Sequence, residues 1–230
     1  AHRSAGGGTV HSGEGDPAWN MAVDEALLKR IENIGKPVLR FYSWNTPAAT
    51  FGYFQKFKNV ERTTQLRPLI RRPTAGGIVP HDNDWTYSLT VPLTDPWHAL
   101  NARESYHRIH LWIAQSFEQL GLDTELAPDC NDGAGSCFAG FEVSDVLLDG
   151  RKVAGAAQRR TRSGLLIQGS VQSTTEFPSR SDWEQTMLGI GTNELGECQT
   201  GSLTSISGVM EAADKLVLSK YANPEFIRKR

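Results

Sequence analysis

Hydrophobic residues recur with helical spacing in two long segments of the chain. Segment 16–34 begins with Asp16 as a cap and Pro17 in the first turn, and its apolar face comprises Met21, Ala22, Leu27, Leu28 and Ile31. Segment 105–122 has an apolar face of the same kind and ends at Gly121. The pattern predicts a helix over each segment, and further helices are predicted near 59–66, 181–189 and 206–221.

Strand patterns occupy much of the remaining chain. Segments 36–44, 49–54 and 69–72 are predicted as strands, and 85–92 alternates apolar and polar residues up to Pro92. Three more strands are predicted over 142–150, 151–159 and 165–173, with a hairpin turn at Asp149-Gly150 joining the first two. Helices and mostly antiparallel strands intermix without a regular βαβ order, which predicts an α+β fold.

Composition narrows the class of protein. The 230 residues are 39% hydrophobic and 22% charged with a net charge of −2, which fits one domain over 1–230, with residues 1–8 expected to be flexible. The near-neutral charge argues against nucleic-acid binding. No apolar run reaches the roughly 20 residues of a membrane helix. An odd number of cysteines without dense spacing and the lack of a secretion signal predict reduced thiols and a cytoplasmic protein.

The segment RRPTAGGIVPHD (71–82) combines glycines with basic residues. Glycines let backbone amides approach a ligand closely, and Arg71 and Arg72 are suited to a phosphate or a carboxylate. The segment has neither the Walker spacing nor the dinucleotide-binding spacing. A β-turn with two solvated arginines fits the residues as well, so the pattern alone leaves the two interpretations open.

A second segment, GRKVAGAAQRR (150–160), places four small residues in a row on a predicted strand. Strands disfavour Gly and Ala, so such a run indicates that something lies close against the backbone. Lys152 beside it can act as a point charge for an anion or, in a dry pocket, as a base. Arg159, Arg160 and Arg162 are suited to acidic partners. A solvated lysine and a solvated basic edge are the ordinary alternatives.

Cys137 lies in the Gly-rich loop GAGSCFAG, just before this strand. A thiol becomes a useful nucleophile when a neighbouring cation or base lowers its pKa from about 8.5. The alternative is a structural cysteine, as we expect for Cys130 and Cys198. A zinc site built from Cys130, Cys137 and a histidine lacks the usual ligand spacing, so no metal site is predicted.

Taken together, these segments resemble the lipoate–protein ligase and octanoyltransferase superfamily, relatives of biotin protein ligase, over nearly the whole chain. DPAWNMAVDEALL resembles the opening helix of the family, and RRPTAGGIVPHD its acyl- and nucleotide-binding motif. DVLLDGRKVAGAAQRR resembles the strand that carries the family's lysine, and TGSLTSISGVMEAA the closing helical segment. Four motifs in the right order make the resemblance specific.

The resemblance implies a catalytic domain of the biotin and lipoate protein ligase type. It has a central, mostly antiparallel sheet flanked by helices and a tunnel for an eight-carbon acyl chain, with no accessory C-terminal domain expected here. Lys152 matches the active-site lysine. The residues implied to bind the substrate are Arg72, Thr74, Ala75, Gly76, Gly77, His81, Tyr87, Ala154, Gly155, Ala157 and Gln158.

The resemblance leaves the branch of the family open. SCFAGFEVSDVLLDGRKVAGAAQ and DWTYSLTVP are similar to the cysteine-dependent octanoyltransferases. In that branch Cys137 would take octanoate from acyl carrier protein, without a cofactor. It would pass the acyl group to a lysine of a lipoyl domain, such as that of glycine cleavage H protein or a dehydrogenase E2.

Two alternatives remain beside the transferase. Gly77 is ligase-like, and an ATP-dependent lipoate–protein ligase would use ATP and Mg²⁺. Ala75, Ile78 and Pro80 depart from both patterns, which also fits a non-catalytic relative that binds lipoyl groups.

Overall fold

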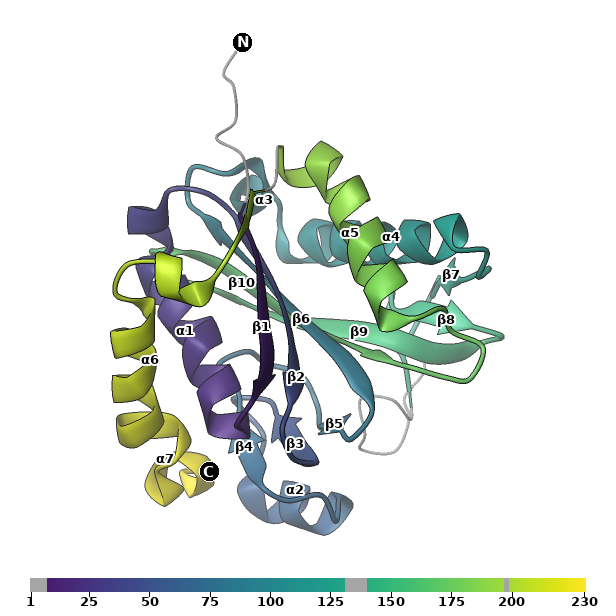
Figure 1. Cartoon of the computed structure of the whole chain (residues 1–230). Helices are drawn as coiled ribbons and strands as arrows, with labels where there is room; N and C mark the ends of the chain where they lie inside the picture. The colour runs from purple at the N-terminus through teal and green to yellow at the C-terminus, as the bar shows by residue number, and fades with distance from the viewer. Residues whose placement is uncertain (1–7, 131–139, 197–198) are drawn as a thin grey trace.

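A mixed β-sheet runs through the middle of the computed structural model, which describes residues 8–130, 140–196 and 199–230 (Figure 1). Within these residues the strand order is β11-β1-β2-β6-β10-β9-β8-β7. β1 is parallel to β2 and β11, and the other neighbours are antiparallel. The strands are β1 (Gly8–Gly15), β2 (Val38–Trp44), β6 (Asp84–Pro92), β7 (Glu125–Leu126), β8 (Val146–Leu148), β9 (Arg151–Arg160), β10 (Gly164–Gln172) and β11 (Gln199–Gly201).

A smaller sheet, ordered β4-β3-β5, packs beside the large one and carries the segment 71–82. Its strands are β3 (Ala48–Phe51), β4 (Leu69–Arg71) and β5 (Val79–His81). Together the two sheets confirm the α+β prediction. Gly8, the last residue of the start that is expected to be flexible, pairs with Val38 as the first residue of β1. Residues 1–7 lie outside the described part of the chain.

Helices cover both faces of the large sheet (Figure 1). α1 (Pro17–Ile34) and α6 (Val209–Leu216) lie on one face, and α4 (Ala102–Gln119) and α5 (Arg180–Leu195) lie on the other. Shorter elements complete the fold: α2 (Phe57–Thr63), α3 (Pro96–Ala99), the 3₁₀ turn η1 (Leu203–Ser205), the π turn η2 (Val217–Tyr221) and α7 (Pro224–Arg228). Among the described residues no helix is long and apolar enough to cross a membrane.

Local sequence explains the main helix boundaries. The Asp16 side chain accepts hydrogen bonds from the first turn of α1, and Gly35 ends that helix in the left-handed conformation, φ 70°. α4 begins three residues before the predicted start because Asn101 and Glu104 form a capping box. The Asp149-Gly150 turn is confirmed, since both residues have positive φ, as a tight hairpin between twisted strands requires.

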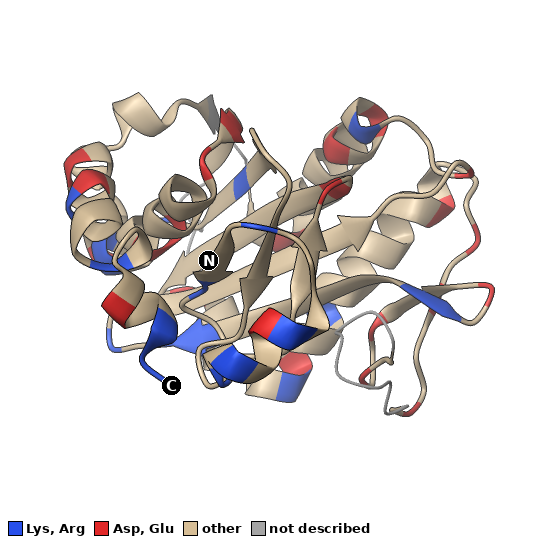
Figure 2. Ribbon diagram, turned by 90° about the horizontal axis from the view of Figure 1, so that it is seen from below, with Lys and Arg blue, Asp and Glu red and all other residues tan. Residues whose placement is uncertain are grey.

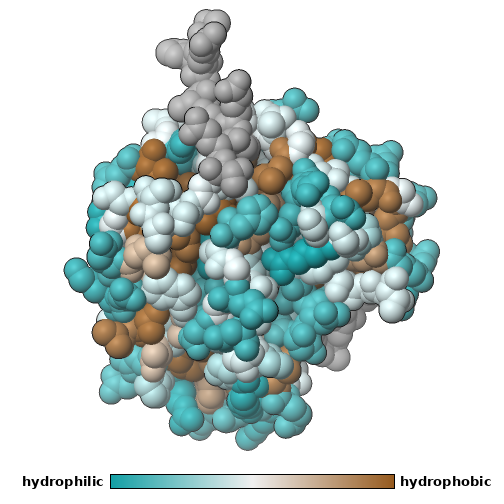
Figure 3. All heavy atoms as spheres, viewed as in Figure 1, coloured by the Kyte–Doolittle hydropathy of each residue, from teal (hydrophilic) through white to brown (hydrophobic). Residues whose placement is uncertain are grey.

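Two hydrophobic cores fill the space on either side of the sheet. β2 divides its side chains between them: Val38 and Tyr42 pack toward α1 and α6, whereas Leu39 and Phe41 pack toward α4 and α5. On the face of the molecule seen in Figure 3, exposed hydrophobic residues form small separate groups among hydrophilic ones. The two cores bury apolar side chains between the helices and the sheet, and this burial is the main source of the stability of the fold.

Candidate active site

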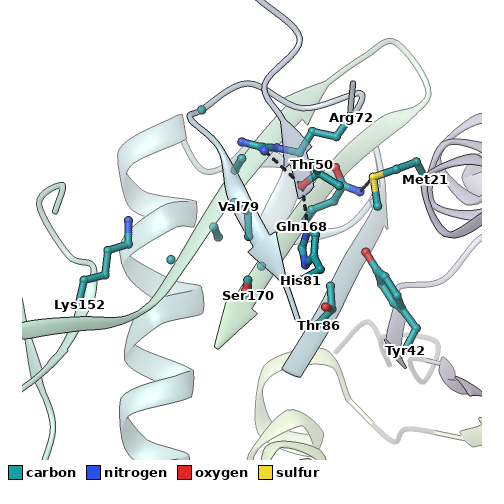
Figure 4. A pocket seen from close by; sticks show the side chains of 15 residues that line it. Met21, Tyr42, Thr50, Arg72, Val79, His81, Thr86, Lys152, Gln168 and Ser170 are labelled. Atoms are coloured by element: carbon teal, nitrogen blue, oxygen red, sulfur yellow. Dashed lines mark hydrogen bonds between the residues drawn. The ribbon is translucent and has the colours of Figure 1, made fainter. Parts of the chain in front are cut away.

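The two small-residue segments face each other across one pocket, which encloses about 470 Å³ of empty space including its open mouth. Figure 4 shows Lys152 entering from one side, with Met21 and Tyr42 on the opposite side. The pocket is lined by Met21, Tyr42, Thr50, Arg72, Gly76, Val79, His81, Thr86, Lys152, Gly155, Ala156, Ala157, Gln168, Gly169 and Ser170. Of the residues implied by the resemblance, Arg72, Gly76, His81, Lys152, Gly155 and Ala157 therefore border it.

The alternation of side chains along β9 decides which of the remaining residues border the pocket. Gly155 and Ala157 pair with Ser170 and Gln168 of β10, so all four share the pocket face. Ala154, by contrast, pairs with Val171 in the core beneath α4. Ala154, Gln158 and Tyr87 are not among the residues that line the pocket.

Gln158 and Tyr87 have other roles on that opposite face. Gln158 donates to the carbonyl of Ala102 and accepts from Ser105 at the start of α4. The Tyr87 ring packs across Gly169, where an added Cβ atom would lie 2.2 Å from the Tyr87 hydroxyl oxygen. Tyr87 therefore supports the pocket from behind the sheet.

A β-bulge turns Lys152 toward the pocket. The register of β9 on β8 shifts between Val146, which pairs with Ala154, and Leu147, which pairs with Lys152. Val153 and Ala154 consequently both pack into the core beneath α4. Lys152 is thereby placed on the same side as Gly155, although simple alternation would separate the two. Bulges re-aim side chains in this way next to active sites.

Lys152 is held by a buried carboxylate that the sequence reasoning missed. Its Nζ lies 2.7 Å from Oδ2 of Asp145, and both side chains are almost completely buried. The Tyr106 hydroxyl donates to Oδ1 of Asp145 at 2.5 Å, and the backbone amide of Glu142 donates to Oδ2 at 2.7 Å. Burial and the Asp145 carboxylate raise the pKa of Tyr106 well above its usual range, so its hydroxyl stays a donor.

His110 lies next to this cluster as a neutral ring. Its Nδ1 is 2.8 Å from the carbonyl oxygen of Tyr106, which can only accept, so Nδ1 is assigned the proton. Nε2 then carries a lone pair and lies 4.0 Å from Oδ1 of Asp145. Burial lowers the pKa of His110 to about 4, despite the nearby carboxylate. At neutral pH His110 therefore does not compete with Lys152 for Asp145.

The glycine turn, residues 74–77, is held by Arg72 of its own segment and by Gly52, which packs against it. The Arg72 guanidinium donates to the carbonyl of Ala75, with Nη2 at 2.6 Å, and Nε also reaches Oγ1 of Thr74 at 3.2 Å. Gly76 has φ +89°, which favours glycine. Gly52 backs the turn so closely that a Cβ atom there would lie 1.9 Å from the Gly76 carbonyl oxygen.

Three residues of the predicted binding loop thus support the turn and are not part of the pocket lining. Thr74 is fully buried and donates to the Gln168 side chain at 2.8 Å. Ala75 contributes the carbonyl that Arg72 binds. Gly77 completes the turn between Gly76 and the buried Ile78.

The arginine pair has two different functions. Arg72 borders the pocket, as predicted. Arg71 is fully buried and donates to the carbonyls of Tyr53, Gln55, Phe226 and Ile227. The prediction that Arg71 binds an anion is therefore wrong, because its guanidinium joins helix α7 to the loop after β3.

His81 stands in the pocket wall between a hydroxyl and a carboxylate. Its Nδ1 is 2.8 Å from Oδ2 of Asp84, and its Nε2 is 2.8 Å from Oγ1 of Thr50. Thr86 and Ser170 also donate to Asp84, at 2.9 and 2.6 Å. The polar groups along this wall are thus directed toward each other, which leaves largely carbon atoms to meet a bound chain.

A buried ion pair forms the floor beneath the pocket. The Asp24 carboxylate of α1 accepts from Arg40 at 2.7 Å, and also from Tyr42, Ser88 and Gln168. Four donors satisfy both of its oxygens, as a buried carboxylate requires. This contact fixes α1 against β2, β6 and β10, and Gln168 extends the network to the glycine turn.

Residues 16–197 match the family model described as the lipoyl protein ligase A/B catalytic domain. The chain belongs to this family. Octanoyltransferase LipM of Halalkalibacterium halodurans is 38% identical over 176 residues, which cover 70% of this chain and 64% of the relative. LipM of Bacillus subtilis is 38% identical with 70% and 63% coverage, and LipM of Staphylococcus aureus is 34% identical with 70% and 64% coverage. The chain thus spans slightly less than two thirds of these curated relatives.

Solved structures share the fold of this family member. Lipoate-protein ligase A bound with ATP superposes with a TM-score of 0.79 at 19% identity, covering 97% of this chain and 99% of the other. The bipartite lipoate protein ligase of Thermoplasma acidophilum gives 0.74 at 18% identity, with 97% and 96% coverage. The prediction of a mostly antiparallel sheet flanked by helices, of the lipoate ligase type, is confirmed.

The predicted nucleophile, Cys137, and also Cys198 lie outside the described residues. Cys130 is described and is exposed, so it is not the buried structural cysteine that the sequence suggested. The loop that contains Cys137 is closed at its base by hydrogen bonds between Ala127 and the pair Ser144 and Asp145. Among the described residues no group of three metal-binding side chains occurs.

Proposed function

We propose that this chain moves an octanoyl group from acyl carrier protein, through a thioester on Cys137, to a lysine of a lipoyl domain. One observation carries the proposal. The loop that contains Cys137 begins and ends beside Asp145, the residue that holds Lys152 at the pocket. The identity of 34–38% to octanoyltransferases supports the same chemistry.

The reaction consists of two acyl transfers. The Cys137 thiolate attacks the thioester carbonyl of the donor, so a new carbon–sulfur bond forms as the bond to the carrier's thiol breaks. The carrier's sulfur leaves with a proton, which replaces the one that Cys137 lost. The acceptor amine then attacks the enzyme thioester, an amide forms, and the Cys137 thiol is regenerated. Thioester exchange is nearly isoenergetic and amide formation drives the sequence, so ATP is not needed.

Each wall of the pocket has a role in this scheme. The carbon-rich part near Met21 and Tyr42 receives the acyl chain, and the mouth near Lys152 and Gly155 receives the reacting carbonyl. Lys152 either polarises or deprotonates the Cys137 thiol, and backbone amides of the glycine turn stabilise the developing oxyanion. Losing one such donor typically lowers the rate by about 10²–10³-fold.

Basic residues beside the glycine turn are suited to an acidic carrier or lipoyl domain. Arg159 donates to the Pro73 carbonyl at 3.2 Å, and its guanidinium lies over the ring of Tyr53. The charged groups of Lys229 and Arg230 lie over the same ring. Figure 2 shows Lys and Arg gathered around this C-terminal region. Arg160, in contrast, binds groups at the ends of helices α3 and α4, so it is not part of this basic surface.

Intact-protein mass spectrometry after mixing with octanoyl carrier protein, without ATP, tests the proposal. We expect a hydroxylamine-sensitive octanoyl adduct that is absent from Cys137→Ser. Cys130→Ser is the matched control, because Cys130 is an exposed thiol near the same loop, and it should retain the adduct. A Cys137→Ser variant that transfers at the wild-type rate would refute the assignment.

Two other outcomes would identify the alternatives. Transfer to a lipoyl domain only from free octanoate or lipoate with ATP and Mg²⁺ would establish a ligase, with Arg72 and the glycine turn as the sites for phosphate. The solved ligase bound with ATP shares the fold and motivates this arm. Binding of octanoate or a lipoyl domain without transfer under either condition would establish a non-catalytic member.

A further inference from the structure

Lys152 could act in the proposed reaction either as a base or as a fixed positive charge. A base must lose its proton to take one from the thiol, whereas a fixed charge must keep it. The surroundings of the amine decide between these roles. The relevant groups are Asp145, Tyr106, His110 and Gly155, none of which was singled out from the sequence for this purpose.

We propose that Asp145 and Tyr106 are positioning residues that hold Lys152 as an ammonium ion facing the pocket, so that Lys152 acts as a charge and not as a base. The inference rests on the proposed function for its catalytic consequence. In the first transfer the Cys137 proton then leaves to water, and water protonates the departing thiolate of the carrier.

The hydrogen-bond arrangement around Asp145 carries this argument. Both carboxylate oxygens receive donors: Tyr106 binds Oδ1, while Lys152 and the Glu142 amide bind Oδ2. Such a carboxylate is fixed in orientation, because moving it would break several bonds at once in a buried site. A buried carboxylate that lost its paired cation would be left uncompensated, so Asp145 and the Lys152 ammonium hold each other in place as a buried ion pair.

Two further features restrict the position of the ammonium group. His110 is neutral and keeps its Nε2 at 4.0 Å from Oδ1, so it offers Asp145 no competing cation at neutral pH. Gly155 leaves room for the lysine, since a Cβ atom there would lie 2.5 Å from Cε and 2.8 Å from Nζ of Lys152. The small residue is required here by the lysine side chain itself, beyond any contact with the acyl group.

The chain contains a second cluster of a carboxylate, a lysine and a tyrosine, and it supplies a matched control. Glu25 of α1 accepts from Lys220 at 2.5 Å and from the Tyr221 hydroxyl. Neither Glu25 nor Lys220 lines the pocket. Breaking this second cluster therefore reproduces the structural loss of a buried carboxylate–lysine–tyrosine contact without altering Lys152.

The test compares Asp145→Asn and Tyr106→Phe with Glu25→Gln and Tyr221→Phe. Single-turnover formation of the octanoyl adduct should slow about 10²-fold in Asp145→Asn, by loss of alignment, and about 10-fold in Tyr106→Phe. The two control variants should keep the wild-type rate. Because Asp145 acts through Lys152, the double variant Asp145→Asn/Lys152→Ala should be no slower than Lys152→Ala alone.

A chemical readout separates this inference from the proposed function. Acetic anhydride labels free amines and not ammonium ions, so labelling of Lys152, measured by peptide mass spectrometry at fixed pH, should rise in Asp145→Asn, which removes the carboxylate paired with the ammonium. Glu25→Gln should leave Lys152 labelling unchanged. Unchanged labelling in Asp145→Asn, or strictly additive rate losses in the double variant, would overturn the positioning role. Absence of any adduct in the wild type would overturn the transferase instead, and the labelling result would still decide the state of Lys152.

Discussion

Gly155→Ala should separate the position of Lys152 from the stability of the fold. The added Cβ would lie 2.5 Å from Cε and 2.8 Å from Nζ of Lys152, against an ordinary carbon–carbon contact of about 3.5–4.0 Å. The ammonium must therefore move by about 1 Å, and a misplacement of that size can lower a rate about 10²-fold. The lysine is flexible and Gly155 has no left-handed φ, so the free energy of unfolding should change by less than about 1 kcal/mol.

The assay measures the initial rate of octanoyl transfer and the urea unfolding curve on the same preparation. Gly189→Ala in α5 is the control, because a Cβ atom there would meet no atom within 4 Å; its rate should stay close to that of the wild type, and its stability should rise by up to about 1 kcal/mol because alanine is the better helix former. A wild-type rate for Gly155→Ala would refute the reasoning that the lysine position limits transfer. A loss of several kcal/mol of stability would show that the close contact is structural.

Three further results are expected. Burial lowers the pKa of His110 from 6.5 to about 4, so on acidification the unfolded state binds a proton at higher pH than the folded state does. The free energy of unfolding should therefore fall by about 3 kcal/mol as the pH drops from 6.5 to 4. Urea titrations of His110→Leu should lack that part of the pH dependence. Gly52→Ala should destabilise the fold by about 1–3 kcal/mol, because its Cβ would overlap the rigid backbone at Gly76; an unchanged unfolding midpoint would contradict the backing role of Gly52. Arg40→Met should lower the free energy of unfolding by about 3–5 kcal/mol, because it leaves the buried Asp24 carboxylate without its cation. Adding Asp24→Leu should recover part of that loss, as measured by chemical denaturation.

Helix positions and the fold class could be predicted because their signals are local. Caps, apolar faces and turn residues lie within a few positions of the elements they define, as at Asp16 and Gly35. The start of α4 was missed because its capping box lies before the apolar pattern begins. The strand β1 was missed because its Gly-rich start resembles a flexible lead-in, and its strand character depends on pairing with β2 and β11.

The alternation of apolar and polar residues along β6 was recognised from the sequence, but the burial of its polar face could not be predicted. A polar face on a strand usually meets water, whereas here Thr86 and Ser88 are buried and bind Asp84 and Asp24. Asp84 lies on β6 itself, two residues before Thr86, but Asp24 reaches the strand only through the packing of α1, so only the assembled fold shows that this polar face is buried.

For the site residues too, those identified by a local motif could be predicted, and those whose role depends on contacts between distant segments could not. Arg72, Gly76 and Lys152 were found by motif. Asp145 and Tyr106 were missed, although Asp145 lies within the lysine-strand motif, because their role depends on an approach between α4 and the base of a loop. The placement of Ala154, Gln158 and Tyr87 away from the pocket lining could not be predicted, because a motif does not record which face of a strand a residue occupies.

The bulge in β9 gives the spacing of this strand a significance of its own. With Val153 and Ala154 both turned into the core, the lysine and Gly155 meet because three positions separate them along an irregular strand. Deleting one of the two intervening residues would restore a regular ladder without changing any residue that borders the pocket. The site therefore depends on the number of residues between the lysine and Gly155 as well as on their identity. Single-residue insertions and deletions in this strand should be far less tolerated than substitutions that keep its length.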